Sequence, residues 1–222
     1  MPFGPIIVEA MRNDSTRMDV QSHNLANSHT SGYRALIPVH DGSNFHTAIN
    51  QMAAHHRETG NPLDFTIEGD GYFVVDRNGQ KLMTRNGSFH IDREGYLVNH
   101  DGFRVQSQSG DIRLNPEAPV EVDKDGTIRQ SQALVGKFMM VKPTGNVRQA
   151  GGACLLHEEG KDWTAATGCE VHNARVEHSN VNPLTEMTDF LSVTRTFELG
   201  QKALHVEGDV NRKLTEEVGR TR

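Results

Sequence analysis

The sequence has 222 residues, a formal net charge of -6 and a mean hydropathy of -0.58, with 35% hydrophobic residues. This acidic balance argues against a nucleic-acid-binding protein, because such proteins carry basic patches that displace counterions. No run of 18 apolar residues occurs, which excludes a transmembrane helix. The low hydrophobic content predicts a thin core or one divided between separate units.

The N-terminal region reads as one amphipathic helix. Ile7, Met11, Met18 and Leu25 recur at spacings of four, seven and seven between charged residues, which gives a narrow apolar stripe. Burying these four side chains gains about 6–12 kcal/mol, whereas ordering about twenty residues costs on the order of 30 kcal/mol. We therefore expect this helix to need the C-terminal helix and neighbouring chains. The first residues lack a basic region before a long apolar run, so we expect no cleaved signal peptide, which alone indicates the cytoplasm.

The middle of the chain reads as β structure. Short apolar segments (YFVV, KLMT, SFHI, YLVN, FRVQ) alternate with glycines that mostly follow Asp, Asn, Glu or Ser, and ALVGKFMMVKP adds a later strand pair. Such dipeptides supply the positive φ that tight hairpins need. The pattern predicts an antiparallel meander forming a small sandwich or barrel. The glycines are Gly71, Gly79, Gly87, Gly95, Gly102, Gly110 and Gly126.

The C-terminal region reads as a second, longer helix with a seven-residue period. Asn182 is the expected N-cap, with Pro183 at the first helical position. A period of seven predicts a coiled-coil seam. The fold class is therefore α+β, with terminal helices pairing as a coiled coil around a mainly antiparallel β domain. One row contains Phe190, Phe197, Leu204, Asn211 and Val218, its companion row Met187, Thr194, Gln201 and Gly208, and Leu184, Leu191 and Leu214 widen the stripe.

No motif in the sequence indicates a catalytic, cofactor or metal site. His55 and His56 are adjacent and cannot share a helix face, and no HExxH motif occurs. The segment DKDGT at Asp123 lacks the glycine that a calcium loop needs at its sixth position. Cys154 and Cys169 lie outside any CxxC motif, so they are either ordinary thiols or a disulfide pair. We predict neither enzymatic activity nor a small-molecule substrate.

The segment NLANSHTSGYRA, residues 24–35, places two asparagines and three small hydroxyl residues at a helix end. One Gly or Asn suffices for a cap, so these amides suit a place where several chain ends satisfy one another's backbones. The segment resembles the NNLAN-x-x-T-x-GY/F-[KR] signature of bacterial flagellar axial proteins, the rod and hook family, although His23 replaces the first Asn.

Three further segments resemble this family, in the family's order: TGNPLDFTIEGDGYFVV, MTRNGSFHIDREGYLVNHDGFRVQ and EHSNVNPLTEMTDFLSVTRTFELGQKAL. Met83 stands where the family usually has Tyr. The residues that carry the signature are Asn24, Leu25, Ala26, Asn27, Thr30, Gly32, Tyr33, Gly69, Asp70, Gly71, Arg85, Gly87, Ser88, Phe89, Ser179, Asn180 and Val181.

The resemblance implies a structural subunit that stacks helically into a tube. It implies a coiled-coil core domain (residues 1–32 with 181–222), extended connecting segments (33–65 with 165–180) and a β-rich outer domain (66–164). The implied partners are other copies of the chain, neighbouring flagellar rod proteins and the flagellar type III export apparatus. The implied location is then the periplasm-spanning rod of the basal body, reached without a cleaved signal peptide. The short chain disfavours the hook protein. The brief stretch Ile37–Gly60 lacks the longer insertion that distal rod proteins often show, so the resemblance favours a proximal rod protein, with a distal rod protein as the alternative.

We expect an assembly seam in which Ile7, Met11, Met18 and Leu25 pack against the C-terminal stripe, and this core then docks on neighbouring subunits. The stripe residues of the seam are Met187, Phe190, Leu191, Phe197 and Leu204. A different class of function is a secreted β-domain binding module, which predicts an aromatic-lined groove. The single Trp and three Tyr do not cluster in the sequence, which disfavours it.

Overall fold

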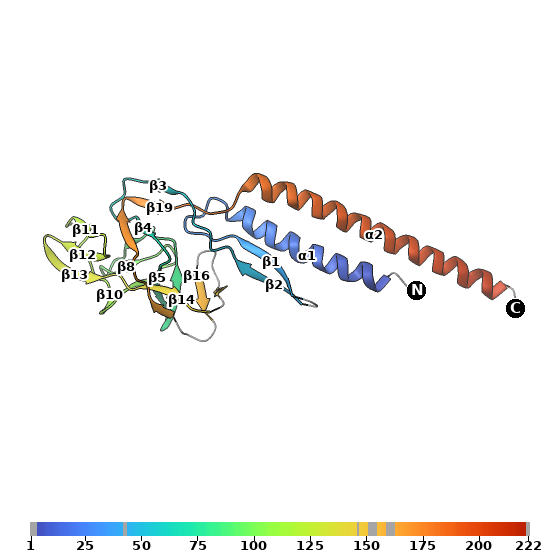
Figure 1. The fold of residues 1–222 in the computed structure, drawn as a ribbon, viewed down its shortest axis with the longest axis horizontal. Helices are drawn as coiled ribbons and strands as arrows, with labels where there is room; N and C mark the ends of the chain where they lie inside the picture. Colours follow the sequence, from blue (N-terminus) through green and yellow to red (C-terminus); the bar gives the residue numbers. More distant parts are fainter. Residues whose placement is uncertain (1–3, 42–43, 146, 151–154, 159–162, 221–222) are drawn as a thin grey trace. The chain divides into compact units, whose positions relative to one another are not determined.

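A computed structural model describes residues 4–41, 44–145, 147–150, 155–158 and 163–220 (Figure 1). The described residues form two compact units. The helical unit is drawn from Met1–Ala26, Leu36–Ala48 and Val181–Arg222, and the β unit from Asn27–Ala35 and Ile49–Asn180. The sequence analysis instead placed residues 27–32 in the helical core domain and treated residues 33–65 as an extended connecting segment.

The helical unit contains the two helices of the chain's described part and one strand pair. Helix α1 (Gly4–Ala26) lies alongside helix α2 (Pro183–Arg220), and β1 (Leu36–Asp41) contacts α1 and pairs with β2 (Asn44–Ile49) (Figure 1). The predicted cap of α2 is confirmed, because Asn182 Oδ1 accepts hydrogen bonds from the backbone N–H groups of Leu184 (3.1 Å) and Thr185 (3.4 Å). Neither described helix is long and apolar enough to cross a membrane.

The β unit consists of short strands. They are β3 (His56–Glu58), β4 (Phe65–Glu68), β5 (Tyr72–Arg77), β6 (Gln80–Thr84), β7 (His90–Ile91), β8 (Leu97–Val98), β9 (Arg104–Ser107), β10 (Gly110–Asp111), β11 (Val120–Val122), β12 (Thr127–Gln130), β13 (Ala133–Lys137), β14 (Met140–Pro143), β15 (Val147–Gln149), β16 (Leu155–Glu158), β17 (Trp163–Ala165), β18 (Glu170–Asn173) and β19 (Arg175–Glu177).

The largest sheet has the order β15-β16-β6-β5-β9-β8-β7, with β10 beside β9, and β14 beside both β5 and β17. Strands β11, β12 and β13 form a second sheet, β4 pairs with β18, and β3 pairs with β19. The strand registers of the β unit are antiparallel, as predicted. The order is not a simple meander, because β9 and β14 both pair with β5, at Val75 and Phe73 respectively. Strands β13 and β14, expected as a pair, instead join β12 and β5.

The core of the β unit is built around four phenylalanine rings. Phe65, Phe73, Phe89 and Phe138 lie with ring centroids between 5.2 and 6.5 Å apart, mostly in edge-to-face or tilted arrangements. Such pairs add stabilisation beyond that of the apolar area they bury. Buried aliphatic residues from β4, β5, β6, β8, β9, β12 and β18 surround them. This core accounts for most of the buried apolar residues of the described chain.

Two glycines serve a purpose other than the one predicted. Gly79, Gly95, Gly102, Gly110 and Gly126 have positive φ, as the hairpin pattern predicts. The prediction is wrong for Gly71 and Gly87, which do not. A Cβ at Gly87 would lie 1.9 Å from the carbonyl oxygen of Phe65, and one at Gly71 would lie 3.0 Å from Cys169 Sγ. These positions need glycine because neighbouring atoms leave no room for a side chain.

Candidate assembly surface

Helices α1 and α2 run antiparallel, as contacts at four successive levels show. Gly4 N–H donates to Glu207 Oε1 (3.3 Å), and Asn24 Nδ2 donates to Glu186 Oε1 (3.2 Å). Between these ends, a Cβ built at Gly200 would lie 2.9 Å from Met11 Cγ, and Thr194 Oγ1 lies 3.7 Å from Met18 Sδ. Early residues of α1 therefore meet late residues of α2.

Most of the least exposed residues of α2 alternate at spacings of four and three along the helix, and Thr194 and Asp209 lie outside this series. Among the apolar residues expected at the seam, Phe190, Phe197 and Leu204 belong to this inward row, and Ile7, Met11 and Met18 are the half-buried counterparts on α1. The alternation averages 3.5 residues, which is the spacing of a heptad repeat. The inward row is Glu186, Phe190, Val193, Phe197, Gly200, Leu204 and Glu207.

Sequence reasoning missed Val193 and Gly200. Val193 is buried, and a Cβ built at Gly200 would lie within van der Waals distance of Met11. The expected companion row began at Met187, three residues before Phe190, and Met187 is exposed. The inward row instead continues with Val193, three residues after Phe190. The alternating three-and-four spacing starting from Phe190 is the signal that identifies Val193 and then Gly200.

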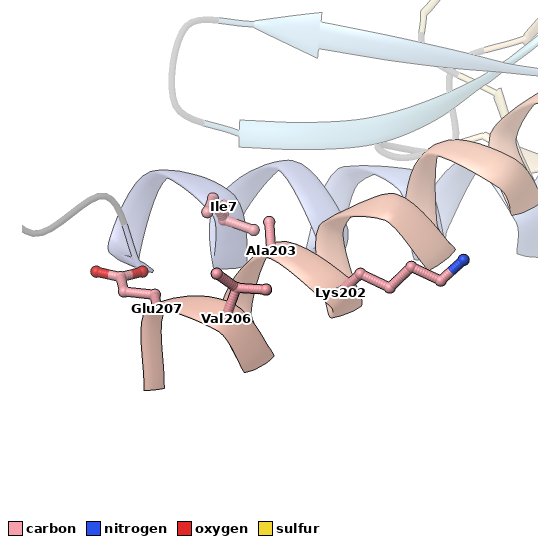
Figure 2. A pocket seen from close by; sticks show the side chains of 5 residues that line it. All are labelled: Ile7, Lys202, Ala203, Val206 and Glu207. Carbon is pink, nitrogen blue, oxygen red and sulfur yellow. The ribbon is translucent and has the colours of Figure 1, made fainter. Parts of the chain in front are cut away.

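The remaining residues of the expected seam are exposed. Leu25, Met187 and Leu191 present apolar side chains to solvent in the single chain. Beside the inward row, a groove is lined by Ile7 of α1 and by Lys202, Ala203, Val206 and Glu207 of α2. Figure 2 shows Ile7 and Ala203 on the facing sides of the two helices, with Val206 next to them. Apolar surface thus remains on the outside of the helix pair. Leu214 and Val218 have side chains outside the described part.

Asn24, at the end of α1, has a defined role within the helical unit. Its Oδ1 accepts a hydrogen bond from Leu36 N–H (2.8 Å), and its Nδ2 donates to the Leu36 carbonyl (2.9 Å) as well as to Glu186. One buried amide therefore pairs with β1 as a neighbouring strand would, and also joins α1 to α2. Burial raises the pKa of Glu186, and the hydrogen bond from Asn24 opposes that rise.

In the β unit, a cluster of three charges joins segments that are distant in the sequence. Arg34 Nη2 lies 2.6 Å from Glu177 Oε1, and Arg85 Nη1 lies 3.6 Å from Glu177 Oε2, with all three side chains at most 7% exposed. Arg85 also donates to the carbonyl oxygens of Ile67 (2.8 Å) and Gly69. Burial lowers the pKa of Arg34, and the charge of Glu177 opposes that effect. We call Arg34, Arg85 and Glu177 the buried charge cluster.

Two signature residues complete the backbone contacts around this cluster. Gly32 N–H donates to the Glu177 carbonyl (2.8 Å), and its φ is +69°. Asn180 Oδ1 accepts from Ala35 N–H (2.7 Å), and its Nδ2 donates to the carbonyl oxygens of Asn50 (3.1 Å) and Met52 (3.0 Å). The chain segments that enter and leave the β unit are thus held by side chains that satisfy backbone groups.

The other signature residues occupy several separate places. Tyr33 is fully buried, and Val181 is buried in the helical unit. Asp70 pairs with Lys142 (2.9 Å), and the hydrogen bond from this lysine lowers the pKa of Asp70. Ser88 Oγ donates to Asp64 Oδ1 (3.0 Å).

The remaining signature residues, namely Leu25, Ala26, Asn27, Thr30 and Ser179, are exposed or half-buried. Asn27 and Thr30 form a turn in which Thr30 N–H donates to the Asn27 carbonyl (3.1 Å). Within the described residues, no three His, Cys, Asp or Glu side chains gather where they could hold a metal ion. Cys154 lies outside the described residues, so its pairing with Cys169 stays open.

Two family models match the chain. The model described as the flagellar hook protein FlgE/F/G D1 domain matches residues 66–130, within the β unit. The model described as the flagellar basal body rod FlgEFG protein C-terminal region matches residues 172–216, which include most of α2. The matches therefore cover both units.

Curated relatives match over most of the chain. The chain is 32% identical over 200 residues to the flagellar basal-body rod protein FlgF of Mesorhizobium japonicum, covering 82% of this chain and 83% of the relative. It is 30% identical to FlgF of Escherichia coli, covering 83% and 85%. The flagellar basal-body rod protein FlgG of Bacillus subtilis is 23% identical, covering 93% and 95%.

Proposed function

We propose that this chain, which belongs to the family of flagellar basal-body rod proteins and is FlgF-like, assembles through its helical unit. A structural rod subunit must present surface to its neighbours, and large exposed apolar side chains mark such surface. Most of these side chains in the described chain lie on the two helices, whereas the β unit contributes Met52 and Leu134. Those on the helices are Ile6, Val8, Leu25, Leu184, Met187, Leu191, Leu199, Val206 and Val210.

In this proposal, the inward rows of α1 and α2 form a coiled coil, and the outer apolar side chains contact other copies and neighbouring rod proteins. The antiparallel contacts and the 3.5-residue spacing of the inward row support the coiled coil. The partly exposed seam supports the need for neighbours, because Leu25, Met187 and Leu191 keep their apolar side chains exposed in the single chain. The higher identity to FlgF of Mesorhizobium japonicum and of Escherichia coli than to FlgG of Bacillus subtilis supports a position in the proximal rod.

Assembly of the purified full-length chain, measured by sedimentation and electron microscopy, tests this function. Phe197→Asp places a charge in the inward row and should abolish sedimentable polymers. Thr215→Asp, which adds the same charge at an exposed position near the end of α2, serves as the matched control. Trp163 fluorescence should be unchanged in both variants, because Trp163 lies in the β unit. Polymers of Phe197→Asp at the normal yield would refute the proposal.

Export by the flagellar type III apparatus, without cleavage of a leader, completes the proposal. Membership of the family of flagellar basal-body rod proteins supports it. Intact mass measurement of the chain recovered from isolated basal bodies should give the mass of the full sequence. A shortened N-terminus would contradict uncleaved export while leaving the assembly proposal intact.

A further inference from the structure

Two rows of exposed residues on α2 have matching chemistry. Row one is Leu184, Leu191 and Glu198, and row two is Leu199, Val206 and Lys213. Within each row the residues are seven apart, so they lie one above the other on one face of the helix. Each row has two apolar residues followed by a charge, and the two charges are opposite.

Row one lies on the side of α2 away from the inward row, and row two borders the groove that Val206 and Ile7 of α1 line. Leu184 and Leu191 are 72% and 48% exposed, and Leu199 and Val206 are each 62% exposed. Between the rows runs a polar series that includes Thr188, Arg195 and Lys202. Neither row belongs to the inward row that meets α1.

We propose that row one of one copy docks on row two of a second copy, with the two α2 helices parallel and offset by 15 residues. This inference rests on the proposed function and specifies the contact between copies. An offset of 15 residues aligns each member of row one with its counterpart in row two, and it corresponds to about 22 Å along a helix. Leucine then meets leucine, leucine meets valine, and Glu198 meets Lys213.

The groove described above fits this register. Met187 of the copy that presents row one comes level with Lys202 of the second copy, beside the apolar lining formed by Ile7, Ala203 and Val206 (Figure 2). Met187 is exposed and unbranched, and a methionine side chain adapts well to a shallow apolar groove.

The relation between the rows favours an open series of copies over a closed dimer. At 3.6 residues per turn, fifteen residues make four full turns plus about 60°, so the rows are turned about 60° from each other around the helix. One copy therefore presents row one to one neighbour and row two to another. A contact between two different surfaces is heterologous, and it continues from copy to copy instead of closing after two.

Cysteine cross-linking of the full-length chain tests the register. In a background in which Cys154 and Cys169 are replaced with serine, a copy carrying Leu191→Cys is mixed with a copy carrying Val206→Cys under mild oxidation. We expect a covalent dimer at a yield about tenfold above that of either copy alone. The mismatched mixture of Leu184→Cys with Val206→Cys, offset by 22 residues, is the control and should give only the background yield.

Charge exchange gives a second measurement. Glu198→Lys and Lys213→Glu should each slow polymerisation about tenfold, because like charges then face each other. The double variant restores the pair and should assemble within about twofold of the unaltered chain. Polymers that form without the 191–206 cross-link, or a double variant no better than the single ones, would overturn this register alone. A chain that forms no polymers under any condition would overturn the proposed function together with it.

Discussion

Replacing Glu177 with glutamine should destabilise the β unit more than replacing Arg34 with methionine. The buried charge cluster holds two positive charges and one negative charge. Glu177→Gln leaves two buried guanidinium groups without their carboxylate, and loss of a buried partner costs about 3–5 kcal/mol. Arg34→Met leaves one arginine facing one glutamate and mainly removes the hydrogen bond to the Met52 carbonyl, at a cost of about 1–3 kcal/mol.

Urea unfolding followed by the fluorescence of Trp163 measures this difference. Trp163 is the single tryptophan of the chain and packs against the second apolar cluster of the β unit. With an m-value of about 2 kcal/mol per molar urea, the midpoint falls by about 1.5–2.5 M for Glu177→Gln and by about 0.5–1.5 M for Arg34→Met. Glutamine has nearly the volume of glutamate, and methionine nearly that of arginine, so changes in packing contribute little to the comparison.

The double variant provides the control. In the Glu177→Gln background, Arg34→Met removes one of two repelling charges, so the combined cost should fall short of the sum by at least about 1 kcal/mol. The reasoning fails if Arg34→Met costs as much as Glu177→Gln, or if the two costs are additive.

Three further predictions each test a single feature of the structure. Gly32→Ala should cost more than about 3 kcal/mol by Trp163 fluorescence, because its methyl group would lie 2.2 Å from a backbone nitrogen at φ +69°. Gly60→Ala, at φ +73° in open space, should cost only about 1–2 kcal/mol, and equal costs would contradict the steric argument. Gly208→Ala, also in open space, should stabilise α2 by about 0.5–1 kcal/mol in thermal melts followed by circular dichroism at 222 nm. Gly200→Ala should gain nothing, because its methyl group meets a methionine of α1, and a matching gain would argue against that contact. Hydrogen bonds, first from a lysine and then from a threonine, lower the pKa of Asp125 from 3.8 to about 2. The stability it contributes is therefore present above the unfolded pKa and lost as pH falls through about 2. Asp125→Asn should thus have a lower urea midpoint than the unaltered chain near pH 5 and the same midpoint below about pH 2; a constant difference would contradict this linkage.

The order of helix, antiparallel β structure and helix follows from local patterns that the sequence displays directly. Hairpin turns at Asn-Gly and Asp-Gly, the Asn182 cap and the seven-residue period each depend on a few neighbouring residues. Strand order does not, because it depends on which distant strands share an edge. Nothing near Phe73 in the sequence indicates that β14 pairs with the same strand as β9. The need for glycine at position 87 could not be predicted for the same reason, because the atom that leaves no room for a side chain there belongs to Phe65.

The apolar stripe of α2 could be predicted, but the sequence did not fully show which of its residues face α1 and which are exposed. Residues three before and three after Phe190 both lie close to it on the helix surface, so the spacing by itself did not separate Met187 from Val193. The sequence also did not predict that Gly200 faces α1. A glycine adds no apolar signal, although close approach of Met11 requires its lack of a side chain.

The contacts divide the signature residues and the exposed rows into two groups: substitutions in the first affect folding, and substitutions in the second affect assembly. Arg85, Asn180 and Gly32 satisfy charges and backbone groups inside the β unit, and Asn24 does so inside the helical unit, so substitutions there act first on folding. The exposed rows on α2 contribute little to the folded single chain, because their side chains remain largely in water. Substitution of Leu191 or Val206 with aspartate should therefore change the free energy of unfolding by less than about 0.5 kcal/mol. The same changes should reduce polymer yield strongly, and a variant that loses stability and assembly together would mean that the rows are packed within their own chain.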